Sequence, residues 1–237
     1  PLYKVRENNL KLKIFSSLLR INMNVNNVTV IIKYLSQTDP CLREIIRSVG
    51  DFSIKIRKDP FQSLVESIIY QQLAGSAARV IYSRFIKYYN NDNNNINSRP
   101  FFPEQIRSTP NSVFRSSIGL SNKKIEYIKD LSTKVIERKL DVSTLRALSD
   151  EEVIAQLIQV KGIGRWTAEM FLIFCLGRLD VLPVTDLGIR KAMQKTYSLS
   201  DLPKPTEMLS IAQPWKPYRS VATWYLWKSL SKFHSIG

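Results

Sequence analysis

Two glycines and one aspartate are the residues of this chain whose types and spacing indicate chemistry. Gly162 and Gly164 alternate in the run VKGIGRWTA, between two stretches with the periodicity of amphipathic helices. Glycine tolerates positive φ and, because it lacks Cβ, lets a phosphate approach the backbone. The second helix would begin at this hairpin, so its N–H groups and positive dipole end would face the same anion. The pattern predicts a backbone anion site, although an ordinary helix–helix turn also explains two glycines.

Asp186 follows 22 residues after Gly164, at the predicted start of another helix. A carboxylate fixed there can stabilise positive charge on a reacting group, or orient and deprotonate a water molecule. The alternative is an ordinary helix N-cap, a role that Asp fills very commonly. Residue type alone favours the capping role, but capping and catalysis are not exclusive, so Asp186 stays a candidate for both.

Composition bounds the partners and the cofactors. The 237 residues carry a formal charge of +15 with a pI near 9.9, which favours a nucleic acid partner, although a solvated basic surface gives the same charge. Two cysteines, Cys41 and Cys175, and one histidine, His234, are too few for a disulfide framework, an iron–sulfur cluster or a His/Cys metal site. No signal peptide or membrane-length apolar run is found, so we expect an intracellular, reducing compartment.

The elements that must position these residues are predicted to be helices, and the fold class to be all-α. Asp59-Pro60 is a helix start with Asp as N-cap and Pro at the first helical position. Ser149 to Glu152 is a capping box that opens the first hairpin helix. Helical periodicity covers residues 28–35, 42–49, 61–70, 77–89, 121–138, 186–197 and 218–230. Residues 1–25 are expected to be an N-terminal arm or an extra helix.

Four separated motifs, spread over roughly residues 26–232, together resemble the helix-hairpin-helix superfamily of DNA base-excision glycosylases. They are Gln71-Gln72-Leu73, the hairpin followed by Trp166-Thr167-Ala168, Pro183-Val184-Thr185-Asp186, and Trp215-Lys216-Pro217-Tyr218-Arg219-Ser220 with Trp227 beyond it. The Trp-Thr-Ala version resembles the alkylation-repair branch, the 3-methyladenine DNA glycosylase II type. The resemblance implies a glycosylase domain at 26–237 with two helical lobes flanking a cleft. One lobe, 80–183, would carry the hairpin, and the rest would form the second lobe.

The resemblance also implies roles for the motif residues. Asp186 would face the positive charge that develops on the sugar as the N-glycosidic bond breaks. In bifunctional members a lysine two places after the second hairpin glycine forms a Schiff base with the sugar, and here that place is Trp166. We therefore expect hydrolysis without strand cleavage. The phosphate-binding hairpin would consist of Lys161, Gly162, Ile163 and Gly164.

The base pocket and the DNA wedge follow from the same resemblance. Trp166, Met170 and Trp227 would line the pocket, where aromatic faces suit a cationic N-alkylated purine. Gln72 and Leu73 would enter the duplex once the target nucleotide is extruded. Core packing is the alternative for both Leu73 and Trp227. Met170 stands where some bacterial members have tyrosine, and Ala74 where some eukaryotic relatives have a polar residue, so substrate range and minor-groove contacts are open.

The leading hypothesis is therefore a monofunctional DNA glycosylase that flips out and excises alkylated purines of the 3-methyladenine type. We expect a monomer that binds double-stranded DNA with damaged bases, no membrane and no organic cofactor, with Na⁺ or K⁺ held at hairpin carbonyls. It would be intracellular and DNA-associated, and nuclear in a eukaryote. The alternative is a non-catalytic hairpin protein that binds DNA or abasic sites, for which Asp186 is dispensable. A basic RNA-binding scaffold explains the charge but not the aspartate spacing.

Overall fold

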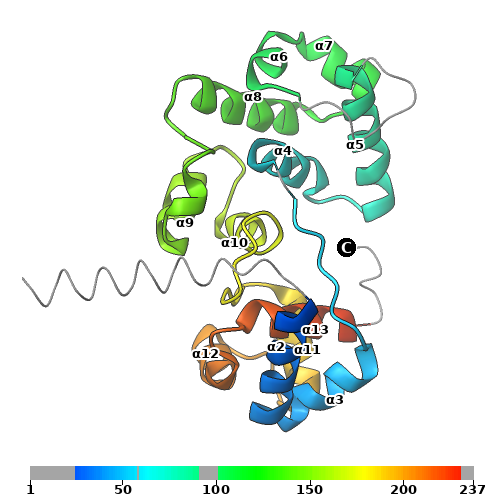
Figure 1. Ribbon diagram of the computed structural model, residues 1–237. Coiled ribbons are helices and arrows are strands. Elements are labelled where there is room, and N and C mark those ends of the chain that lie inside the picture. Colours follow the sequence, from blue (N-terminus) through cyan, green and yellow to red (C-terminus); the bar gives the residue numbers. More distant parts are fainter. Residues whose placement is uncertain (1–24, 58, 91–100, 231–237) are drawn as a thin grey trace, which may run out of the picture. The chain divides into compact units, whose positions relative to one another are not determined.

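Every regular element in the described part of the chain is a helix, which confirms the all-α class (Figure 1). The computed structural model describes residues 25–57, 59–90 and 101–230. The arm or extra helix expected at residues 1–25 lies outside these ranges, except that Val25 begins helix α2. Within the described ranges, no helix is both long and apolar enough to cross a membrane.

The chain divides into two compact units, which we name the hairpin unit, Ile56–Leu176, and the aspartate unit, Pro1–Lys55 with Gly177–Gly237. These bounds differ from the hairpin lobe expected at 80–183. Helix α4, Pro60–Tyr70, accounts for the earlier start, because it packs against three helices of the hairpin unit. The sequence pattern of α4 showed its apolar face but not which neighbours that face would contact.

The hairpin unit is built around α4, α8 and α10. Helix α8 packs against α4 and α6, and α10 packs against α4 and α9. Side chains that are completely buried in this unit include Leu64 and Ile68 of α4, Phe85 of α5 and Ile128 of α8. The other elements are α5 Gly75–Asn90, α6 Pro103–Ser108, α7 Asn111–Val113, the π-helix η1 Phe114–Ile118, α8 Asn122–Ile136, η2 Leu145–Ala147, α9 Asp150–Leu157 and α10 Arg165–Phe174.

In the aspartate unit, α13 packs against α3 and α11, and α3 also packs against α2. Asp39 is the N-cap of α3 and accepts hydrogen bonds from Tyr197 Oη at 2.6 Å and from Trp215 Nε1 at 2.7 Å. This buried carboxylate therefore joins the N-terminal helices to the C-terminal ones within the unit. The elements are α2 Val25–Thr38, α3 Pro40–Val49, α11 Leu187–Thr196, α12 Pro205–Ile211, η3 Gln213–Trp215 and α13 Arg219–Ser229.

The helix-start signals of the sequence are confirmed where they bear on the site. Asp59 accepts a hydrogen bond from the Gln62 N–H at 2.8 Å, and Pro60 is the first residue of α4. Ser149 and Glu152 form the expected capping box at α9, which precedes the hairpin. The start of α9 is thus set locally, by side chains that satisfy otherwise unpaired N–H groups.

Candidate functional site

Asp186 lies in the aspartate unit as the N-cap of α11. Its Oδ1 accepts hydrogen bonds from the Ile189 N–H at 2.8 Å and from Trp227 Nε1 at 3.2 Å. The side chain is only 8% exposed, and a helix N-terminus is a favourable place for negative charge. The capping role is confirmed, and the two donors hold the carboxylate in one orientation.

Trp227 of α13 is buried, as its core-packing alternative expects, and its indole N–H also contacts Asp186. Sequence reasoning assigned this residue to a base pocket and did not find the hydrogen bond. A buried indole N–H usually needs an acceptor, and here the acceptor is the candidate catalytic carboxylate. Trp227 therefore helps to hold the Asp186 carboxylate in place, and its assignment to a base pocket stays a prediction.

The hairpin lies between α9, which ends at Leu157, and α10, which begins at Arg165. Gly162 has φ +78°, and a Cβ at this position would overlap the ring of Tyr127 from α8. Gly164 instead has φ −97° and is the N-cap of α10, with no atom within 4 Å of an ideal Cβ. Of the two glycines, only Gly162 uses the positive φ that glycine tolerates. Position 162 therefore needs glycine, both because of the Tyr127 ring and because of its positive φ, whereas the space beside Gly164 is open.

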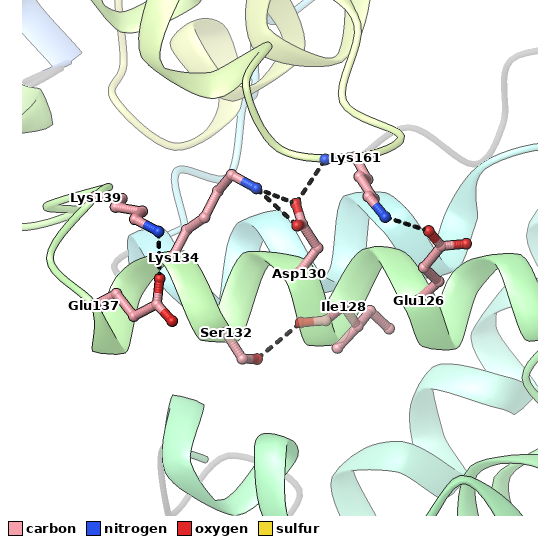
Figure 2. Close-up of polar contacts among 8 residues, drawn as sticks. All are labelled: Glu126, Ile128, Asp130, Ser132, Lys134, Glu137, Lys139 and Lys161. Atoms are coloured by element: carbon pink, nitrogen blue, oxygen red, sulfur yellow. Dashed lines mark hydrogen bonds and ion pairs between the residues drawn. The ribbon is translucent and has the colours of Figure 1, made fainter.

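Two of the hairpin N–H groups are used inside the protein. Ile163 N–H donates to the Val160 carbonyl at 3.0 Å, and the Ile163 side chain is 4% exposed. Lys161 N–H donates to Asp130 Oδ2 at 2.8 Å (Figure 2). The Ile163 N–H therefore already has an acceptor inside the hairpin, and the assignment of this residue to phosphate binding stays a prediction. In the described part of the chain, no protein acceptor is found for the N–H groups of Gly162 and Gly164.

Helix α8 presents two carboxylates to the hairpin, Glu126 and Asp130, which we name the α8 carboxylates (Figure 2). Asp130 also accepts from Lys134 Nζ, at 2.7 Å to each oxygen. Burial opposes ionisation of Asp130, but the hydrogen bonds from Lys134 and from the Lys161 N–H outweigh it and lower its pKa. Glu126 Oε1 lies 2.7 Å from Lys161 Nζ, and this hydrogen bond raises the pKa of the lysine. Sequence reasoning missed both carboxylates.

The loop between α4 and α5 carries the predicted wedge residues. Gln72 is exposed with φ +55°, and Leu73 is 38% exposed, so the core-packing alternative for Leu73 is wrong. The preceding residue, Gln71, donates from Nε2 to the Gly162 carbonyl at 2.9 Å. This contact joins the loop to the hairpin, and no local pattern predicts it because the two residues are 91 positions apart.

Trp166 and Met170 lie one turn apart on α10, directly after the hairpin. Trp166 is 43% exposed and Met170 is half-buried, so this face of α10 is partly open to solvent. Their assignment to a base pocket stays a prediction. The described residues contain no group of three or more His, Cys, Asp or Glu side chains that could hold a metal ion.

Comparisons with known proteins place these features in a family. Residues 65–217 match the HhH-GPD superfamily of base excision DNA repair proteins. DNA-3-methyladenine glycosylase 1 of Schizosaccharomyces pombe is 34% identical over 201 residues, which cover 83% of this chain and 85% of that protein.

Two solved structures share the fold. The 3-methyladenine DNA glycosylase of Schizosaccharomyces pombe in complex with abasic DNA has a TM-score of 0.73 and 34% identity, covering 84% of this chain and 95% of that chain. A DNA-3-methyladenine glycosidase from Bacillus halodurans has a TM-score of 0.72 and 35% identity, covering 86% and 90% respectively. Both similarities extend over most of the chain.

Proposed function

Because the chain belongs to the HhH-GPD superfamily of base excision DNA repair proteins, we propose that it is a monofunctional DNA glycosylase. It binds double-stranded DNA, extrudes a damaged nucleotide and hydrolyses the bond between an alkylated purine and its sugar. Relatives named for 3-methyladenine support this substrate class. The action is in base excision repair, at DNA inside the cell, and in the nucleus if the cell is eukaryotic.

The observation that carries the proposal is the placement of Asp186. Its carboxylate is buried, caps α11 and is fixed by the Ile189 N–H and the Trp227 indole. As the glycosidic bond breaks, electrons leave with the base and positive charge develops on the sugar. A preorganised carboxylate stabilises that charge without having to reorient at the moment of reaction.

Water completes the reaction in this proposal. The oxygen of a water molecule adds to C1′ of the sugar, and its proton is taken up by Asp186 acting as general base. The products are the free base and an intact strand with an abasic site. The position that would hold a Schiff-base lysine carries Trp166, whose indole cannot form a covalent bond to the sugar.

We assign the DNA contacts to the hairpin unit. A phosphate would accept hydrogen bonds from the N–H groups of Gly162 and Gly164, at the positive end of α10. Leu73, exposed on its loop, would fill the stack that the extruded nucleotide leaves. Trp166, Met170 and Trp227 keep their proposed roles in recognising the damaged base.

A monovalent cation at the hairpin remains part of the proposal. The oxygens available are backbone carbonyls, which are hard donors that suit Na⁺ or K⁺. The Val160 and Gly162 carbonyls each accept one protein hydrogen bond and each retain a second lone pair. Such an ion would add positive charge beside the bound phosphate. Replacing KCl by tetramethylammonium chloride at equal ionic strength should then weaken DNA binding more in the wild-type protein than in a variant with an altered hairpin, such as Gly164→Ala.

The substitution Asp186→Asn tests the catalytic assignment. Asn caps helices about as well as Asp and keeps an oxygen that can accept from Ile189 and Trp227, so the fold should persist. Single-turnover release of methylated purines should fall by about 100-fold or more. Affinity for duplex DNA should change little, because the hairpin is untouched.

A matched control is Asp59→Asn, since Asp59 caps α4 in the same way and has no proposed catalytic role. It should release bases at the wild-type rate. An Asp186→Asn variant that keeps most of its single-turnover activity would refute the catalytic role. A wild-type chain that binds abasic DNA but releases no base would instead support the non-catalytic alternative.

A further inference from the structure

We propose that Glu126 competes with DNA phosphate for Lys161, and thereby sets the affinity of the protein for undamaged duplex. The inference rests on the proposed function, in that it takes the hairpin as the phosphate-binding element. In the absence of DNA the Lys161 ammonium is paired with Glu126, and on binding it would exchange that carboxylate for a phosphate oxygen. The two anions would thus be alternative partners of one lysine.

The geometry makes Glu126 the partner that a phosphate must displace. Lys161 Nζ lies 2.7 Å from Glu126 Oε1, and the pair is formed by two elements of the same unit (Figure 2). The Lys161 backbone is held separately, because its N–H donates to Asp130 at 2.8 Å. The lysine side chain can therefore change partners without moving the hairpin. Its neighbour in the chain, Gly162, presents one of the N–H groups proposed to bind the phosphate.

The exchange is energetically accessible because the pair is at the surface. The two side chains are 59% and 54% exposed. Ion pairs exposed to this degree are weak, since water and salt screen them and both side chains lose rotamer freedom. A DNA phosphate, with the charge of the whole duplex behind it, is a stronger competitor than one screened carboxylate. Glu126 therefore lowers DNA affinity without abolishing it.

The test is a double-mutant cycle on the full chain, with Glu126→Gln and Lys161→Gln. Affinity for a labelled undamaged duplex is measured by fluorescence anisotropy at several KCl concentrations near 0.1 M. Glu126→Gln should tighten binding by about 1.5- to 5-fold, the range expected for releasing one exposed ion pair. Lys161→Gln should weaken binding and reduce the slope of log K against log [salt] by about 0.9. In the Lys161→Gln background, Glu126→Gln should change affinity by less than about 1.5-fold.

Glu137→Gln is the matched control. Glu137 pairs with Lys139 at 2.7 Å at the C-terminal end of α8, about 16 Å along the helix from Glu126. This separation exceeds a Debye length of about 10 Å, so the charge of Glu137 is largely screened from the Lys161 ammonium beside Glu126, and its removal should leave affinity unchanged. Equal tightening by Glu126→Gln with and without Lys161, or by Glu137→Gln, would reduce the effect to general charge repulsion and overturn the proposal.

Two further readouts separate this inference from the proposed function. An unchanged affinity and salt slope in Lys161→Gln would refute phosphate binding by this lysine, whether or not the protein releases bases. Failure of the wild-type chain to release methylated purines would refute the glycosylase proposal. Even then, the double-mutant cycle would still test whether Glu126 and phosphate compete for Lys161, because its affinities are measured on undamaged DNA.

Discussion

Substituting the two hairpin glycines one at a time should separate packing from DNA binding. Gly162→Ala places a Cβ against the Tyr127 ring and forces a residue with a side chain to adopt φ +78°. The left-handed conformation costs about 1–2 kcal/mol and displacing the ring about 1–3 kcal/mol. Because Tyr127 is half-buried and can yield, we expect about 2–4 kcal/mol in total. In a protein of this size that lowers Tm by roughly 5–15 °C.

Gly164→Ala should change the stability of the protein little and weaken DNA binding. Its φ of −97° suits alanine, and no atom lies within 4 Å of the added Cβ. Weaker N-capping by Ala costs up to about 1 kcal/mol, partly offset by the smaller entropy of the unfolded chain, so Tm should move by less than about 4 °C. DNA affinity should nevertheless fall by about tenfold or more, because the methyl group occupies the approach to N–H groups that bind a charged oxygen.

Thermal unfolding and anisotropy titrations with several duplex sequences check both expectations. The loss in Gly164→Ala should be similar for every duplex, since phosphate contacts carry no sequence information. Adding Tyr127→Ala to Gly162→Ala should recover part of the lost stability, although the φ strain remains. Wild-type affinity in Gly164→Ala, or a loss restricted to certain sequences or lesions, would refute the hairpin as a nonspecific phosphate anchor. A Tm loss in Gly164→Ala as large as in Gly162→Ala would refute the packing role given to Tyr127.

Leu73→Ala should weaken binding to an abasic-site analogue by about tenfold or more and binding to undamaged duplex far less, because only the former has a gap to fill. Equal losses for both DNAs in anisotropy titrations would contradict the wedge role. Borohydride treatment during turnover should trap no covalent complex, because Trp166 occupies the lysine position, and robust trapping would assign a lyase activity. Asp130 has a pKa below its ordinary value of 3.8 in the folded state, so it stabilises the protein above that pH and loses this contribution as pH falls through the lowered pKa. The Tm difference between wild type and Asp130→Asn should therefore shrink from pH 6 to pH 2, and a constant difference would contradict this reading.

The sequence predicts the parts of this protein that depend on neighbours along the chain. Asp59, Ser149 and Asp186 cap helices as expected, because an N-cap is satisfied by N–H groups only two or three residues away. The short helices α6 and α12 were not expected, although each begins with proline. Six or seven residues are too few to show the apolar periodicity of a helix, and a proline alone does not predict a helix start.

What the sequence does not predict are the partners that lie far along the chain. Glu126 and Asp130 are four residues apart, so both must share one face of α8, but no local pattern says that this face meets the hairpin. Their contacts with Lys161 span 35 and 31 residues, and the contact between Trp227 and Asp186 spans 41. The burial of the Ile163 side chain was not predicted for the same reason, since it depends on tertiary packing.

The hydrogen bond from Gln71 to the Gly162 carbonyl has a consequence for how such a protein would search DNA. A searching protein slides along phosphates and must test, at intervals, whether a base leaves its stack easily. In the proposed complex, Gln71 joins the start of the loop that carries Leu73 to the phosphate-binding hairpin. Leu73 and the phosphate-binding hairpin then move along the DNA together, so the phosphate spacing of the duplex sets the interval at which stacking is tested. The protein would test each nucleotide at a constant distance from the phosphate that the hairpin binds, whatever the base sequence.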